Sequence, residues 1–158
     1  MKKSAGFLSQ GGLIAALYVV LTLISAALGL SSGAVQLRLS AALWFLACLT
    51  PAAVPGLFLG CLLGNLLSGC PAPDVLFGSL ATLLGAAGTR LLRRHRLLAC
   101  LPPIFSNTVI VPLILILVYR VEQAYPLLLL TVGAGEVLSC GLLGQLLYGA
   151  VLRGKRRL

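Results

Sequence analysis

The sequence is poor in the groups that carry out acid–base, metal or redox chemistry. Asp and Glu together number three, there is one His, and only 9% of the 158 residues are charged. The sequence has no G-x-x-x-x-G-K-[ST] motif, Cys-x-x-Cys pair or Ser, His and Asp set, which argues against a phosphate loop, a paired-cysteine metal site and a nucleophilic triad. We therefore expect no enzyme and no metal site. Among the five cysteines, Cys70 near a predicted helix end leaves a redox role open beside plain packing.

The chain is instead rich in long apolar runs. Hydrophobic residues make up 59% of it, and the net charge of +9 comes from short clusters of Lys and Arg between those runs. Such clusters are typical of membrane-protein loops kept on the cytoplasmic side, and they do not favour a nucleic-acid partner. We predict an all-α membrane protein with a single domain over residues 1–158. The predicted spans are approximately 11–30, 37–50, 52–70, 75–92, 97–119 and 126–152.

The positive charges decide between six spans and five. With six spans and both termini cytoplasmic, ten of the 12 Lys and Arg residues lie inside, and Arg38 and Arg120 lie outside. Fusing residues 39–61 into one span would leave three inside and nine outside. The positive-inside rule therefore favours a six-helix bundle. We expect a multi-pass protein of a bacterial cytoplasmic membrane.

Glu136 is the one formally charged residue in the last apolar run, 126–152. An acid inside a membrane helix costs about 3 kcal/mol unless it faces protein, water or a ligand. Gly133 and Gly135 precede it and Ser139 follows one turn later, so this helix face is small and easily approached. We expect Glu136 to lie at the centre of a polar site.

In the six-span topology the polar side chains gather in the outer half of the bundle. Asn107 and Glu136 lie about 15 to 18 Å from the outer surface, at 1.5 Å per helical residue. A pocket open to the outside, with these two residues as its floor, would satisfy their polar groups. The predicted substrate-binding residues are Gln36, Arg38, Ser40, Trp44, Asn65, Asp74, Asn107 and Glu136, and Asp74 is also a plausible helix N-cap.

These residues also have simpler interpretations. Asn107 and Glu136 could bond only each other and so link two helices, Trp44 could belong to the core, and Arg38 could be solvated. As ligand groups, the carboxylate offers two acceptors to adjacent N–H groups, such as those of a guanine-like base. The amide of Asn107 offers a donor and an acceptor, and Trp44 or Phe45 could stack on a flat ring.

A stripe of small residues opens the first predicted span. Gly11, Gly12, Ala15 and Ala16 form two overlapping small-xxx-small pairs, which allow another helix to approach closely. The partner could be a helix of this chain or a separate membrane subunit. With no energy-converting element of its own, a binding protein of this size would either hand over its ligand passively or use energy from another subunit.

Five sequence stretches resemble the QueT family over nearly the whole chain. They are Val35-Gln36-Leu-Arg38-Leu-Ser40, Thr50-Pro51 through Asn65, Asp74 through Thr82, Pro103-x-x-Ser106-Asn107 and Gly135-Glu136-Val137. The QueT family comprises predicted queuosine-precursor transporters, which are regarded as substrate-binding (S) components of energy-coupling factor (ECF) transporters. The resemblance implies six helices, an outer pocket for a 7-deazaguanine base, and partners that are a transmembrane coupling subunit and two cytoplasmic ATPases.

The resemblance also implies roles for particular residues. Gly12 and Ala16 would contact the coupling subunit, and ATP would be used by the partner ATPases while this chain binds no cofactor. The chain departs from the family at Ala41, where relatives carry an acid after the serine; if that acid contacts a cationic substituent, this protein prefers the neutral 7-cyano precursor to the 7-aminomethyl one. The alternatives are an S component for another vitamin or nucleobase, and a structural membrane protein. Whether the loop Ser31–Leu39 closes on binding stays open.

Overall fold

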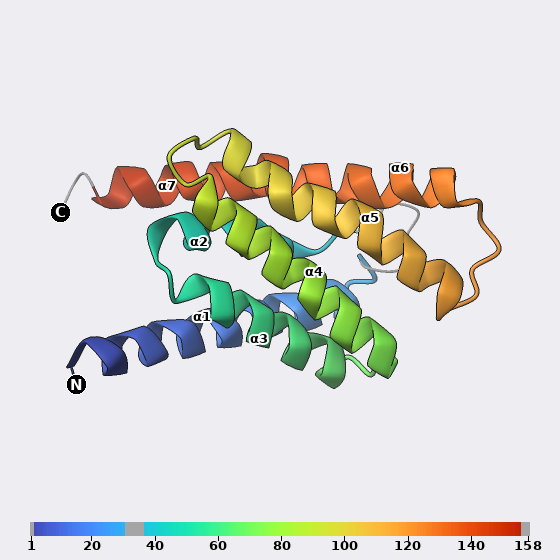
Figure 1. Ribbon diagram of the computed structural model, residues 1–158, viewed down its shortest axis with the longest axis horizontal. Helices are drawn as coiled ribbons and strands as arrows, with labels where there is room; N and C mark the ends of the chain where they lie inside the picture. The colour runs from blue at the N-terminus through green and yellow to red at the C-terminus, as the bar shows by residue number, and fades with distance from the viewer. Residues whose placement is uncertain (1, 31–36, 156–158) are drawn as a thin grey trace.

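The described part of the chain, residues 2–30 and 37–155 of a computed structural model, is helical and contains no strand. The helices, labelled as in Figure 1, are α1 (Lys2–Ala27), η1 (Leu39–Phe45), α2 (Leu46–Leu49), α3 (Ala53–Leu67), α4 (Ala72–Leu91), η2 (Leu98–Cys100), α5 (Leu101–Leu117), α6 (Tyr125–Glu136), η3 (Val137–Gly144) and α7 (Gln145–Lys155). Joined where they are continuous, they form six helical segments. The predicted all-α bundle of six helices is confirmed.

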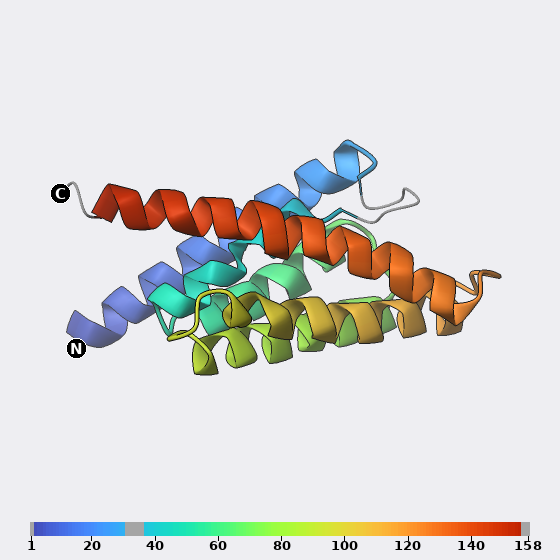
Figure 2. The ribbon, with the colours of Figure 1, turned by 90° about the horizontal axis from the view of Figure 1, so that it is seen from above.

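The last helical segment is a single long rod made of α6, η3 and α7 (Figure 2). Its middle part, η3, is a π-helix of eight residues that begins directly after Glu136. Among the described residues, three stretches are long and apolar enough to cross a membrane: Ser4–Ala27, Leu98–Leu117 and Tyr125–Gly154. The rod is therefore the longest of these candidate spans, and it carries the buried acid near its middle.

The second helical segment, predicted over 37–50, is mostly a 3-10 helix. The seven residues of η1 are followed by only one turn of α-helix in α2. Residues 40–45 of η1 are all buried, because the segment runs through the interior and packs against η3 and α1. A 3-10 helix rises about 2 Å per residue and is thinner than an α-helix. The seven residues of η1 therefore span a greater length than they would as an α-helix, and they need less width. That geometry brings Ser40 and Trp44 inside the bundle.

Three glycines on one face of α3 bring this helix close to α1. A Cβ atom added to Gly56 would lie 2.8 Å from the backbone oxygen of Gly11, and one added to Gly60 would lie 3.0 Å from that of Ala15. Gly64 faces Thr22 in the same way, one turn farther along. Because side chains are missing here, the two backbones pack almost directly against each other.

This packing divides the small-residue stripe of α1 into two halves. Gly11 and Ala15 face α3, and Ala15 is buried. Gly12 and Ala16 are exposed, and nothing lies within 4 Å of a Cβ atom added to Gly12. The interpretation as packing within the chain therefore holds for Gly11 and Ala15, whereas Gly12 and Ala16 are exposed.

The two ends of the bundle differ in charge. The start of α1, the end of α7 and the connection between α4 and η2 lie toward the same end (Figure 1). The basic run at residues 90–96 covers the last turn of α4 and most of that connection. Within it, Arg96 donates hydrogen bonds to Gln145 Oε1 at 2.9 Å and to the Gln145 carbonyl at 2.8 Å, which ties the connection to α7. The Ser68–Cys70 turn after α3 lies toward the other end (Figure 1).

Candidate functional site

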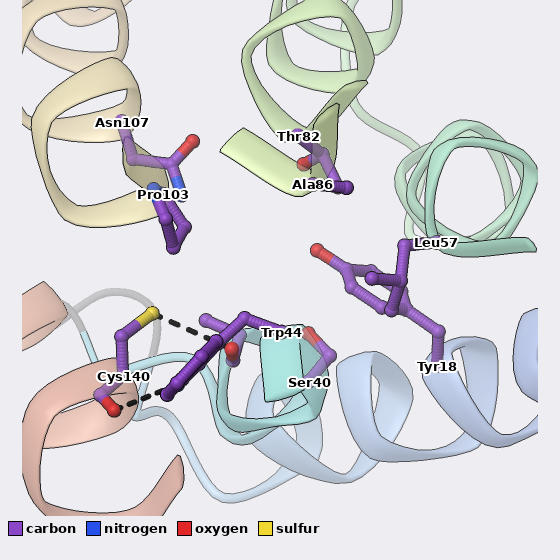
Figure 3. A pocket seen from close by; sticks show the side chains of 10 residues that line it. Tyr18, Ser40, Trp44, Leu57, Thr82, Ala86, Pro103, Asn107 and Cys140 are labelled. Atoms are coloured by element: carbon purple, nitrogen blue, oxygen red, sulfur yellow. Dashed lines mark hydrogen bonds between the residues drawn. The ribbon is translucent and has the colours of Figure 1, made fainter. Parts of the chain in front are cut away.

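A cavity with an empty volume of about 310 Å³ lies in the middle of the bundle, and we call it the inner cavity. The walls come from α1, η1, α3, α4, α5 and η3 (Figure 3). The lining residues are Tyr18, Ser40, Ala41, Trp44, Leu57, Thr82, Ala86, Pro103, Asn107 and Cys140.

Glu136 lies directly behind one wall of the inner cavity. Its side chain is 3% exposed, and its Oε2 accepts a hydrogen bond from the Cys140 thiol at 3.4 Å. The Asn107 amide and the Arg38 guanidinium also interact with the carboxylate. Both Asn107 and Cys140 line the cavity. The acid therefore faces protein and the cavity wall rather than lipid, as an intramembrane carboxylate should.

Trp44 belongs to the core and to the cavity wall at once. Its indole N–H donates to the Cys140 carbonyl at 2.8 Å, and its ring meets the edge of Tyr148, with centroids 6.1 Å apart. A Cβ atom on Gly144 would collide with the indole, so the glycine provides the space that the ring occupies. The hydrogen bond and the tight packing fix the ring in place, and Trp44 can offer its surface to a ligand only as a rigid wall.

A second cavity, the outer cavity, has an empty volume of about 360 Å³ and adjoins the first. Its lining residues are Thr22, Ser25, Ala26, Arg38, Ser40, Asn65, Ser68 and Cys70. Ser40 is common to the two cavities and accepts a hydrogen bond from the Thr22 hydroxyl at 2.9 Å. The two cavities thus form a row from the Ser68–Cys70 turn toward Glu136, and four of the predicted polar residues line it: Arg38, Ser40, Asn65 and Asn107.

Asp74 does not cap a helix, contrary to the prediction. α4 begins at Ala72 after the N-cap residue Pro71, so Asp74 lies inside its first turn. Its carboxylate accepts a hydrogen bond from the Tyr119 hydroxyl at 2.7 Å and is 5% exposed. Because proline at the start of α4 already sets the backbone for a helix, no side-chain cap is needed there. Asp74 lines neither of the two cavities.

The Asp74 carboxylate belongs to a polar cluster near the outer cavity. A Cβ atom added to Gly78 would lie 3.1 Å from the Asn65 amide nitrogen and 3.3 Å from Asp74 Oδ1, so these two side chains meet over the glycine. Burial, together with the hydrogen bond to Asp74, raises the pKa of the Tyr119 hydroxyl. Burial also raises the pKa of the Cys70 thiol, as does the charge of Asp74. Both groups stay protonated near neutral pH, and Cys70 is a poor nucleophile.

Two predicted groups need separate mention. Gln36 and most of the loop Ser31–Leu39 lie outside the described residues. Arg38 is partly exposed and lines the outer cavity, where it interacts electrostatically with both Asp74 and Glu136. Among the residues that the structure describes, no group of three His, Cys, Asp or Glu side chains could hold a metal ion.

Sequence reasoning missed several residues of the inner cavity wall. The most polar of them are Tyr18 on α1, Thr82 on α4 and Cys140 on η3. Tyr18 had one available signal, because it is the only aromatic residue in the predicted span 11–30. Cys140 follows Glu136 by four residues, the spacing of neighbours on a helix face. Thr82 ends one of the stretches that carry the family resemblance.

These features define a helical membrane protein with a cavity in the middle of its bundle and a buried carboxylate behind the cavity wall. The chain belongs to the QueT transporter family: the family model, described as QueT transporter, matches residues 8–153. This confirms the resemblance and makes the protein a member of a transporter family. No curated protein and no solved structure matches the chain.

Proposed function

We propose that this protein is the substrate-binding S component of an ECF transporter and takes up a 7-deazaguanine base, a precursor of queuosine. The observation that carries the proposal is the placement of Glu136, a buried carboxylate at the wall of a cavity inside the bundle. A carboxylate in that position costs free energy unless a partner compensates it. In a transporter, a polar solute that enters the cavity can be the partner that compensates the buried carboxylate.

The recognition chemistry follows from the groups on that wall. The Cys140 thiol is a weak donor to Glu136 Oε2, at a long distance of 3.4 Å. The N1–H and amino groups of a guanine-like edge are stronger donors that match two carboxylate oxygens side by side. An entering base would therefore replace the thiol contact, while Asn107 would bond its opposite edge and the Trp44 ring would lie against it.

The charges of the residues that line the two cavities favour one of the two precursors. Ala41, at the position where relatives carry an acid, lines the inner cavity and offers an ammonium group no partner. Arg38 lines the neighbouring outer cavity and would repel a cation. We therefore favour the neutral 7-cyano base over the 7-aminomethyl base.

The orientation proposed from the charges places both termini in the cytoplasm. The basic run at residues 90–96 and the two chain ends share one end of the bundle (Figure 1), which supports this orientation through the positive-inside rule. The row of two cavities then opens toward the outside of a bacterial cytoplasmic membrane. A substrate from outside would reach the outer cavity first and Glu136 last.

The proposed partners are a transmembrane coupling subunit and two cytoplasmic ATPases, which use ATP on behalf of this chain. The exposed Gly12 and Ala16 of α1 are the proposed contacts with the coupling subunit, because their faces are free to receive a helix. This surface lies apart from the face that packs on α3.

Replacing Gly12 with Leu is expected to abolish capture of the coupling subunit and leave ligand affinity unchanged. The added side chain prevents close helix approach without touching α3, since no described residue lies within 4 Å of the new Cβ atom. The measurement is co-purification of an affinity-tagged protein with the coupling subunit. The Gly6→Leu variant makes the same change on another face of α1, also with nothing within 4 Å, and should retain the complex. Equal capture by the two variants would refute the proposed contact.

The experiment that tests the proposed function is mass spectrometry of small molecules that remain bound through purification, followed by thermal unfolding with a panel of bases and vitamins. A bound ligand stabilises the fold by mass action. A 7-deazaguanine should be retained and should stabilise the protein. Stabilisation by a different vitamin would assign another substrate, and stabilisation by none would favour a structural protein in which Glu136 only bonds Asn107.

A further inference from the structure

An apolar groove on the surface of the bundle begins at the first turn of α5, and we call it the α5 groove. It has an empty volume of about 820 Å³. Leu101 and Phe105 in its wall are 50% and 73% exposed, so the groove faces the surroundings of the protein rather than its core. In a bilayer those surroundings are acyl chains. The lining residues are Leu92, Leu101, Pro102, Ile104, Phe105 and Thr108.

Two of the arginines in the neighbouring basic run are used within the protein. Arg90 donates hydrogen bonds to the carbonyl oxygens of Ala47 and Cys48 at 3.2 and 3.3 Å, at the end of α2. Arg96 donates to the side chain and the backbone of Gln145. These two guanidinium groups therefore link helices of the bundle and are not free to hold a ligand.

The other two arginines of the run, Arg93 and Arg94, are exposed, and their side chains make no hydrogen bond or ion pair with a described residue. They directly follow Leu92, which lines the α5 groove. Leu91 and Leu97, on either side of them, are 84% and 76% exposed. Large apolar side chains beside cations are typical of a segment that lies in the headgroup region of a bilayer. We therefore expect the two free arginines at the level of the lipid phosphates, where the groove begins.

We propose that the α5 groove and these two arginines bind one anionic phospholipid, such as a phosphatidylglycerol. The headgroup phosphate lies against Arg93 and Arg94, and one acyl chain lies along the groove beside Leu101 and Phe105. Guanidinium groups bind phosphate through paired, charge-assisted hydrogen bonds. A zwitterionic phospholipid has the same chains but brings a cation close to the arginines. The site therefore selects lipids by the charge of the headgroup.

A second apolar groove between α4 and α5 provides a comparison within the same molecule. Its empty volume is about 910 Å³, and all its lining residues, Leu80 and Leu113 among them, are apolar. None of these residues is next to a Lys or Arg in the chain. The chains of any lipid can fill this groove, so it gives no preference for an anionic headgroup.

The test is binding of phosphatidylglycerol to the purified full chain in a neutral detergent, followed by native mass spectrometry and by thermal unfolding. One phosphatidylglycerol should stay bound to each protein, and the added lipid should raise the unfolding temperature by mass action. Phosphatidylcholine with the same acyl chains should raise it less at equal concentration. Glycerol 3-phosphate, which has the anion without the chains, should not raise it.

The charges are tested by the double variant Arg93→Gln/Arg94→Gln. It should weaken phosphatidylglycerol binding by about 30-fold, or roughly 2 kcal/mol, because each cation at an anionic lipid surface contributes about 1 kcal/mol. Arg120→Gln/Arg153→Gln is the matched control: it removes the same net charge from two exposed residues outside the basic run and should bind as the wild type does.

The groove is tested separately by Leu101→Ala. This variant removes part of the apolar wall at a half-exposed position and should weaken binding by at least about fourfold, the effect of one lost buried CH₂ group. Leu113→Ala is the matched control, because it makes the same change on α5 at a residue that is 43% exposed and lines the second groove. It should leave the affinity for phosphatidylglycerol unchanged.

Four results would overturn the proposal. Equal stabilisation by phosphatidylglycerol and phosphatidylcholine would show that headgroup charge is not recognised, and equal losses in the two double variants would indicate attraction by net charge alone. Stabilisation by glycerol 3-phosphate as strong as that by the lipid would assign the arginines to a soluble phosphate. A protein dimer that forms without lipid and is lost in Leu101→Ala would assign the groove to a second copy of the chain.

Discussion

Replacing Glu136 with Gln is expected to raise the Kd for 7-cyano-7-deazaguanine by about 100-fold or more. The carboxylate offers two acceptors to two N–H groups, and each charge-assisted hydrogen bond contributes about 1.5 to 3 kcal/mol. The amide of Gln keeps one acceptor and turns an NH₂ donor against a ligand donor. Losing roughly 2.7 kcal/mol corresponds to the 100-fold change.

The measurement is calorimetric titration of the purified variant, with its thermal unfolding recorded in parallel. The fold should persist, because Gln can still bond Asn107 and is easier to bury than a carboxylate. Glu122→Gln is the matched control: it makes the same substitution at an exposed residue between α5 and α6 and should bind as the wild type does. If Glu136→Gln bound the base as tightly as Glu122→Gln, the carboxylate would not be a ligand group.

Replacing Gly144 with Ala is expected to destabilise the protein by about 2 to 4 kcal/mol. The new methyl group would collide with the indole of Trp44 and lie 3.0 Å from the Ala42 carbonyl oxygen. Trp44 would have to move and give up its 2.8 Å hydrogen bond to the Cys140 carbonyl. Overpacking a core costs about 1 to 3 kcal/mol of stability, and losing a buried hydrogen bond costs a similar amount. The two costs do not add in full, because the surrounding side chains relax.

Thermal unfolding in detergent measures this effect, and the π-helix η3 provides its own control. A Cβ atom on Gly141 meets nothing closer than Val137 Cγ1 at 3.6 Å, an ordinary contact. Gly141→Ala should therefore be neutral or slightly stabilising, because Ala is the better helix former. Equal unfolding temperatures for the two variants would contradict the packing of Trp44 on Gly144. We also expect Gly144→Ala to weaken ligand binding, since Trp44 and Cys140 both line the inner cavity.

The helical bundle could be predicted because two strong physical signals agree. Apolar runs interrupted by prolines and basic clusters set the number of helices, and the cost of an acid in lipid marked Glu136 before its surroundings were known. Asn107 was found by the same depth argument, and it does line the inner cavity beside Glu136.

The rest depended on contacts that a single sequence does not contain. Nothing in residues 39–45 signals a 3-10 helix, and nothing in residues 137–144 signals a π-helix, although these two segments pack against each other. Asp74 looked like a cap because its residue type suits one, yet proline starts the helix earlier.

The face of α1 that packs inward was equally hidden. The small-residue stripe allows Gly11 or Gly12 to face α3, and the choice is made by the glycines of α3 that receive Gly11. The same choice turns Tyr18 into the cavity, since it lies one turn beyond Ala15 on the packed face.

The central claim is that the cavity beside Glu136 receives a 7-deazaguanine base. The most direct test is a crystal or electron microscopy structure of the wild-type protein with 7-cyano-7-deazaguanine bound. We predict the ring between Trp44 and Tyr18, with its amino edge within about 3 Å of the Glu136 carboxylate. A base found elsewhere, with the acid still bonded only to Asn107 and Cys140, would contradict the account.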